Sequence, residues 1–277
     1  MTSLTRRLPL RTTRPTAADR VRQSGVIAAT VLAIAAAVYG SGFAGGRPIP
    51  EVAGGALAPD ATPVAPAGPA FAIWSVIYAG LVGYAIWQAL PSQAARRRQR
   101  TVGYWMIASL LLNAAWIVCV QAGLLALSVP IIVALLAVLV VAFVRLRREP
   151  GESTADAVLL DGTVGLYLGW VMVATVAGVA AWLRAAGFSG WGVAPTLWAI
   201  ALLVVVACLG SALALWDRGR LAPALATGWG LVWVAVARAE GGLPEDVVAV
   251  TALAAGVLIV LVAVAVRVAR GGRARRS

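Results

Sequence analysis

The stretch Pro69-Ala-Phe-Ala-Ile-Trp-Ser-Val-Ile-Tyr78 begins an apolar run, 68–89, that contains no charged residue. About 20 apolar residues cross the hydrocarbon core of a bilayer as an α-helix, so this run predicts a membrane span. Further runs of similar length and character follow the same pattern at 24–43, 102–122, 125–144, 157–183, 194–215, 221–238 and 247–267. The sequence therefore predicts an all-α integral membrane protein with about eight transmembrane helices.

The composition agrees with a membrane protein. Of 277 residues, 61% are hydrophobic and 12% are charged, and the mean hydropathy is +0.88. Soluble domains are about half apolar and about a quarter charged. The net charge of +12 would indicate a nucleic-acid partner in a soluble protein. Here every basic residue is an arginine and the arginines cluster in termini and loops, so we expect a lipid bilayer and no nucleic acid as partner.

The arginine clusters also predict the orientation. With the N-terminus inside, only Arg47, Arg184 and Arg238 fall on the outer side, and all other arginines fall in cytoplasmic segments. This asymmetry follows the positive-inside rule. We therefore expect a multi-pass protein of the inner (plasma) membrane with both termini in the cytoplasm. The first run is too long for a signal-peptide core and lacks a convincing cleavage site, which favours a retained anchor.

The character of the chain changes after the fifth span. All tyrosines lie in the first five spans, whereas the last three are mostly Ala, Val and Leu with scattered Trp. We divide the chain into a basic tail (1–23), a five-helix core (24–186), a three-helix extension (187–267) and a second basic tail (268–277). Most connections are short, so we expect consecutive helices to pack antiparallel. The one long loop, 44–67, is either a flexible cover over the outer mouth of the bundle or a passive connector.

Aromatic residues in the second span share one helical face. Phe71, Trp74 and Tyr78 follow the spacing i, i+3, i+7, and the prolines before them set the entry to the helix. Facing the bundle near its outer end, these rings would stack on a planar ligand. The alternative is the aromatic belt, in which Trp and Tyr lie at headgroup depth.

The third and fifth spans carry further candidates. Asn113 and Trp116 lie one turn apart, and an amide at this depth needs a hydrogen-bond partner, either a neighbouring helix or a ligand. Tyr167, Trp170 and Ala174 recur along one stripe of the fifth span. In the same span Gly165 and Gly169 form a small-xxx-small pair, which is typical of tight helix packing.

Catalytic chemistry has little support. The chain contains no histidine, and it lacks the HExxH, GxSxG and Walker motifs and any Cys/His ligand cluster. Asp161 is the acid that lies clearly within a hydrophobic run of the core. It either binds a proton or a cationic group, or merely reaches the interface. We therefore expect no enzyme, no catalytic residue, no metal site and no required cofactor.

These clusters, in this order, resemble the TspO/translocator protein family, also called tryptophan-rich sensory proteins or peripheral benzodiazepine receptors. The resemblance covers roughly 24–185, and the three extra helices place the chain nearer to longer, divergent bacterial members. Three motifs carry it. A proline-rich turn followed by Phe, Trp and Tyr corresponds to Pro66, Pro69, Phe71, Trp74 and Tyr78. Asn-x-x-Trp corresponds to Asn113 and Trp116, and Trp followed by Ala-Thr corresponds to Trp170, Ala174 and Thr175.

The resemblance implies a five-helix bundle, often dimeric, that binds porphyrins, haem or sterols. It implies a ligand site formed by Phe71, Trp74, Tyr78, Asn113, Trp116, Tyr167, Trp170 and Ala174, and a homodimer is a further expectation. The chain departs from the family pattern: the usual adjacent prolines are split, and Gly178 replaces an Asn that often follows the Ala-Thr pair. The fifth span also lacks a cholesterol-recognition pattern that ends in Lys or Arg after a Tyr, so we do not expect cholesterol as the ligand.

The leading hypothesis is a membrane receptor or carrier for a planar tetrapyrrole-like ligand, with a role in tetrapyrrole transport or stress sensing. Without histidine, haem iron would need a Tyr ligand or none, so a metal-free porphyrin is the better guest. One alternative is a secondary transporter of a small lipophilic solute coupled through Asp161. Another is a structural protein whose aromatic residues only pack helices.

Overall fold

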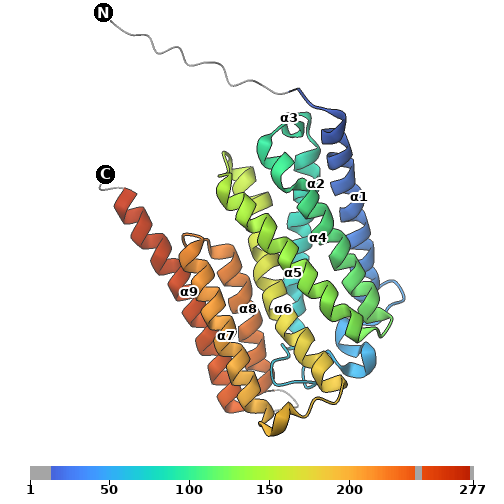
Figure 1. The fold of residues 1–277 in the computed structure, drawn as a ribbon, viewed down its shortest axis with the longest axis vertical. Coiled ribbons are helices and arrows are strands. Elements are labelled where there is room, and N and C mark those ends of the chain that lie inside the picture. Colours follow the sequence, from blue (N-terminus) through green and yellow to red (C-terminus); the bar gives the residue numbers. More distant parts are fainter. Residues whose placement is uncertain (1–13, 241–244, 275–277) are drawn as a thin grey trace, which may run out of the picture.

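The computed structural model describes residues 14–240 and 245–274. These residues include eight helices that are long and apolar enough to cross a membrane, and no β-strand occurs among them (Figure 1). The helices are α1 (Ala17–Gly40), α2 (Ile73–Ala89), α4 (Arg97–Gln121), α5 (Leu125–Arg148), α6 (Thr163–Ala185), α7 (Pro195–Trp216), α8 (Leu221–Ala239) and α9 (Asp246–Ala274). The predicted all-α membrane fold with eight spans is confirmed.

Several boundaries differ from the prediction. Helix α1 begins at Ala17, before the predicted start of the first span at 24, so residues 17–23 are helical. The cause is a capping box, in which the Thr16 hydroxyl accepts from the Asp19 N–H and the Asp19 carboxylate accepts from the Thr16 N–H. Helix α9 likewise continues to Ala274, past the predicted end at 267. The remaining parts of both basic tails, 1–13 and 275–277, lie outside the described residues.

Short helical turns extend two of the spans. A 3₁₀ turn, η3 (Gly68–Ala72), leads into α2, and a π-helical turn, η4 (Asp156–Gly162), leads into α6. A four-residue helix, α3 (Pro91–Ala94), follows α2 and was not predicted. Because Pro lacks the N–H of an interior helical residue, Pro69 and Pro91 are suited to the first positions of η3 and α3.

The first five spans form one bundle with its own core. Helix α1 packs on α2 and α4, α4 packs on α5, and α5 packs on α6, while α2 lies against α6 and η4. One large cluster of buried apolar residues draws on all five helices. This is the arrangement that places α1, α2 and α4 around a common space near one end.

The last three spans attach to this bundle through α8. Helix α8 packs on α6 on one side and on α9 on the other, while α7 packs mainly on α9 (Figure 1). Helix α7 also touches α6 and α8, its neighbours in the chain, but less extensively than α9. Gly169 explains the choice of α8, because a Cβ at this position would lie 2.3 Å from the Pro223 carbonyl oxygen. The small-xxx-small pair of α6 thus serves tight helix packing, as predicted.

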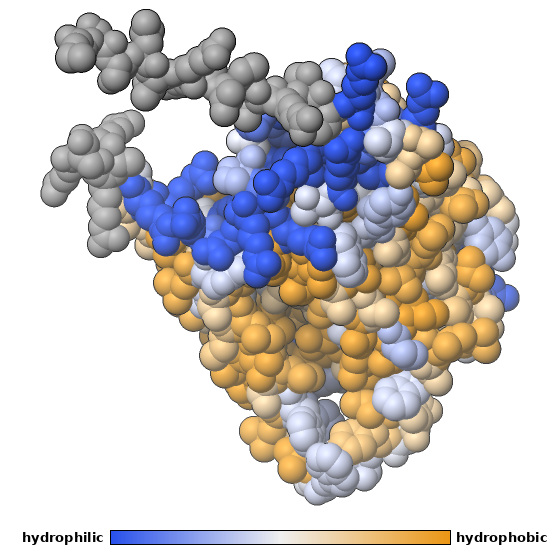
Figure 2. All heavy atoms as spheres, turned by 45° about the horizontal axis from the view of Figure 1, so that its top comes forward, coloured by the Kyte–Doolittle hydropathy of each residue, from blue (hydrophilic) through white to orange (hydrophobic). Residues whose placement is uncertain are grey.

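Charged residues gather at one end of the molecule, which we call the arginine-rich end (Figure 2). The start of α1 and the end of α9 both lie there (Figure 1). Partly buried ion pairs join neighbouring elements at this end: the Arg98 and Arg220 guanidinium groups donate to the Asp161 carboxylate, and Arg100 donates to Asp19. That this end faces the cytoplasm stays a prediction.

The long loop between α1 and η3 lies at the opposite end, which we call the loop end. It contains two 3₁₀ turns, η1 (Ile49–Glu51) and η2 (Ala53–Gly55). Val52 is buried in the core of the five-helix bundle, and Val64 is buried in the core shared by α7, α8 and α9. The loop is therefore packed against both parts of the protein.

Candidate functional site

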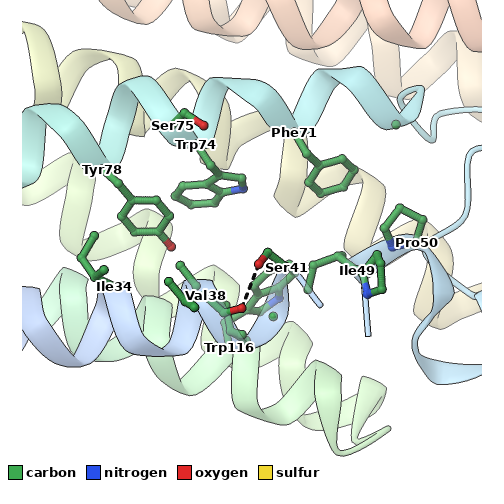
Figure 3. A pocket seen from close by; sticks show the side chains of 15 residues that line it. Ile34, Val38, Ser41, Ile49, Pro50, Phe71, Trp74, Ser75, Tyr78 and Trp116 are labelled. Atoms are coloured by element: carbon green, nitrogen blue, oxygen red, sulfur yellow. Dashed lines mark hydrogen bonds between the residues drawn. The ribbon is translucent and has the colours of Figure 1, made fainter. Parts of the chain in front are cut away.

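A pocket of about 570 Å³ lies between α1, α2 and α4 at the loop end (Figure 3). Helices α1 and α2 are joined at the arginine-rich end, where the Gln23 and Gln88 side-chain amides each donate to the other's backbone carbonyl at 2.6 and 3.1 Å. Toward the loop end the space between them holds the pocket. Its lining comprises Ile34, Ala37, Val38, Gly40, Ser41, Pro48, Ile49, Pro50, Gly68, Phe71, Trp74, Ser75, Tyr78, Trp116 and Ile117.

Helix α2 supplies the aromatic wall of the pocket. Phe71 of η3 and Trp74 and Tyr78 of α2 point toward the facing side chains of α1 and α4 (Figure 3). The Trp74 and Tyr78 rings are stacked, with centroids 5.2 Å apart and an interplanar angle of 23°. The i, i+3, i+7 spacing thus puts all three rings on one face, and this face borders the pocket.

Two predicted residues of α6 support this wall from behind. Tyr167 and Trp170 are 0% and 1% exposed and are not among the lining residues. The Trp74 ring contacts both edge to face, with ring centroids 5.7 Å from Tyr167 and 6.3 Å from Trp170. The Phe71 ring contacts Trp170 in the same way, with centroids 5.8 Å apart. Such edge-to-face contacts fix the orientation of aromatic rings. The α6 residues therefore position the pocket aromatics rather than line the pocket.

Asn113 also lies behind the lining. The Tyr78 hydroxyl donates a 2.7 Å hydrogen bond to the Asn113 side-chain oxygen, and Asn113 is 1% exposed. This bond satisfies the phenol and ties α2 to α4. Of the predicted residues, Phe71, Trp74, Tyr78 and Trp116 line the pocket, whereas Asn113, Tyr167, Trp170 and Ala174 do not. Ala174 packs against the core of the five-helix bundle.

The prediction from sequence missed the wall opposite the rings. Ile34 and Val38 of α1, Ser41 directly after this helix, and the segment 48–50 complete the pocket. The Ile and Val residues have no pattern that separates them from ordinary lipid-facing residues. For the loop 44–67, one of the two interpretations from sequence was a flexible cover over the outer mouth of the bundle. The place of Pro48, Ile49 and Pro50 in the pocket lining agrees with that interpretation.

The chain matches the family described as TSPO-like protein over residues 26–265. It belongs to this family. No curated protein and no solved structure matches the chain significantly. The TSPO-like match begins within α1 and ends within α9, so it includes the three helices of the extension as well as the five-helix bundle. The family is generally one of non-enzymatic membrane receptors and transporters, which suggests ligand binding or transport for this member.

The pocket of this TSPO-like protein is uncharged. Among the described residues, none that lines it carries a charge, and its polar side-chain groups are the hydroxyls of Ser41, Ser75 and Tyr78 and the indole N–H groups of Trp74 and Trp116. The Ser41 hydroxyl donates to the Val38 carbonyl at 2.8 Å (Figure 3). Val38 and Ser75 are exposed on the surface of α1 and α2. The pocket is thus an apolar, aromatic space that opens on the sides of two membrane-spanning helices.

Asp161 lies at the other end of the bundle. Its carboxylate accepts from Arg98 and, at 3.3 Å, from Arg220. These contacts join η4 to α4 and to the start of α8. Within the described residues Asp161 is therefore a member of an ion-pair network, and it does not border the pocket.

Proposed function

We propose that this TSPO-like protein binds a planar hydrophobic ligand of the porphyrin class in the pocket between α1, α2 and α4, as a membrane receptor or carrier. The observation that carries the proposal is the stacked pair Trp74 and Tyr78 bordering a pocket of about 570 Å³. Small-molecule sites are typically concave, mostly apolar and about 300–1,000 Å³ in volume. Flat rings and an uncharged lining favour a flat, apolar guest.

The polar groups favour a metal-free ring. Iron in haem needs a nitrogen, sulfur or phenolate ligand, and the chain has no histidine. Tyr78 is the tyrosine in the lining, and its hydroxyl donates to Asn113. A porphyrin without iron needs no axial ligand and gains its affinity from ring stacking and burial. The exposed positions Val38 and Ser75 support entry of such a ligand from the lipid phase.

The proposal is tested by titrating detergent-purified protein with protoporphyrin IX while following tryptophan quenching and the Soret band. Trp74→Leu removes the stacking surface and is expected to weaken binding about tenfold, the equivalent of about 1.4 kcal/mol. Trp87→Leu is the matched control, because Trp87 lies on the same helix outside the lining. Linear, non-saturating quenching that Trp74→Leu leaves unchanged would mean partitioning into the micelle and would refute the proposal.

A further inference from the structure

Helix α8, from the extension, lies directly behind the aromatic wall of the pocket. The Thr227 hydroxyl donates to the Gly169 carbonyl at 3.2 Å, and Gly169 precedes Trp170, the ring that supports Phe71 and Trp74. At Gly169 the backbones of α6 and α8 approach so closely that even a methyl group would overlap the Pro223 carbonyl. The position of α8 therefore determines where α6 presents its supporting rings.

The same helix holds η3, the turn that leads into α2. The Trp229 indole N–H donates to the Ala70 carbonyl at 2.9 Å, and the Ala67 N–H donates to the Trp233 carbonyl at 3.0 Å. Ala70 immediately precedes Phe71, the first ring of the pocket. Trp229 and Trp233 also contact each other edge to face at 5.6 Å. Two hydrogen bonds, one donated and one accepted by α8, thus fix the segment from which the aromatic wall begins.

A third contact reaches the loop that lines the pocket. Arg238, at the loop end of α8, is 0% exposed, and its guanidinium donates to the Pro59 carbonyl. The loop that this bond restrains also contains the lining segment 48–50. A buried guanidinium that is paired with a backbone carbonyl is costly to separate, since either group would be left without a partner.

We propose that α8 is a positioning element of the ligand pocket, and that Trp229 and Arg238 hold η3 and the loop 41–67 in the geometry that admits ligand. This inference assigns a role to the three-helix extension. It rests on the proposed function, because its effect on ligand affinity is measured with protoporphyrin IX. Its physical basis is preorganisation: a ligand binds more weakly when the binding-competent arrangement of its walls is only fractionally populated. The family match through α9 agrees with an extension that belongs to the functional unit.

The test uses the full chain and two matched pairs of variants. Trp229→Phe keeps the ring and removes the N–H that Ala70 accepts. Trp198→Phe is its control, because the Trp198 indole N–H also donates to a backbone carbonyl, that of Gly190, at 3.1 Å and away from the pocket. Arg238→Met removes the bond to Pro59 and has the exposed Arg184→Met as control. Arg238→Lys keeps a donor and serves as rescue.

Two readouts separate positioning from general stability. Hydrogen–deuterium exchange of peptides covering 41–72 is measured without ligand, and the dissociation rate and Kd of protoporphyrin IX are measured with it. Trp229→Phe and Arg238→Met are expected to speed exchange in this segment and to weaken binding roughly five- to tenfold. For Arg238→Lys, the exchange rate and the Kd are expected to lie between those of Arg238→Met and wild type. Both controls are expected to match wild type.

Unchanged exchange in 41–72 for both test variants would overturn the inference, as would equal effects in the controls. If wild type fails to bind protoporphyrin IX in a saturable way, the proposed function fails. The exchange measurement still decides whether α8 holds this segment.

Discussion

The close approach of α6 and α8 makes Gly169→Ala a quantitative test of the fold. A Cβ at Gly169 would lie 2.3 Å from the Pro223 carbonyl oxygen and 3.0 Å from the Ala226 Cβ, whereas ordinary contact begins near 3.4 Å. The two backbones must therefore separate by about 1 Å, which a close-packed interior resists. Overpacking of this kind costs about 1–3 kcal/mol, and weakening the bond from Thr227 to the Gly169 carbonyl adds up to about 1 kcal/mol.

The same helix offers a matched control. At Gly178 an added Cβ would meet nothing within 4 Å, so Gly178→Ala gains helix propensity of up to about 1 kcal/mol without a clash. Thermal unfolding in detergent, followed by circular dichroism, is the assay. With about 2–4 °C per kcal/mol for a chain of this size, Gly169→Ala should lower the midpoint by roughly 2–16 °C, while Gly178→Ala should leave it unchanged or raise it. Equal midpoints for the two variants would contradict the packing of α8 on α6.

Three further predictions concern buried polar groups. Tyr78→Phe leaves the Asn113 oxygen buried without its donor, so the unfolding midpoint should fall by the equivalent of about 1–2 kcal/mol; an unchanged midpoint would contradict this bond. Asp161→Asn removes one of the two carboxylates that pair with the buried Arg98 guanidinium, while Asp156 remains 3.6 Å away, so the protein should be destabilised by about 1–3 kcal/mol with ligand affinity spared. A normal midpoint with abolished uptake would instead favour the ion-coupled transporter. Burial raises the pKa of Asp217 to about 6, so its ionisation opposes folding above that pH by about 3 kcal/mol at most. The folded protein therefore loses stability as pH rises from the pKa of Asp217 in the unfolded chain through 6. Asp217→Asn should raise the unfolding midpoint relative to wild type at pH 7.5, and this increase should be smaller at pH 4.5. An equal increase at both pH values would show that the carboxyl does not titrate in this range.

The bilayer explains why the sequence predicted so much of the fold. A span must be long and apolar, so runs such as 68–89 and 125–144 are readable without any tertiary information. Tertiary packing is less visible, because lipid-facing and protein-facing residues are both apolar. Helix α7 shows this limit: its short connections to α6 and α8 suggested contact with both, but it packs mainly on α9.

The pocket was predictable on one side. Phe71, Trp74 and Tyr78 share a face by helical spacing alone, and this face does border the pocket. The same spacing groups Tyr167 and Trp170, but spacing does not reveal which neighbour a face meets, and these rings meet Trp74 rather than the cavity.

The remaining wall had no chemical signature. Ile34 and Val38 resemble any lipid-facing residues of α1, and the loop residues gain their role only through packing. The hydrogen bonds from α8 to Ala70 and Pro59 join segments more than 150 residues apart and likewise require the folded structure.

The most direct test of the central claim is to locate a bound porphyrin on the chain. A protoporphyrin derivative that carries a photoreactive diazirine is added to the full-length protein, irradiated, and mapped by peptide mass spectrometry, with excess protoporphyrin IX as competitor. We predict competed labelling of the α1, α2 and α4 segments that contain Val38, Trp74 and Trp116. Labelling that the competitor does not reduce, or that is centred on exposed aromatic residues such as Trp191, would contradict a porphyrin site in this pocket.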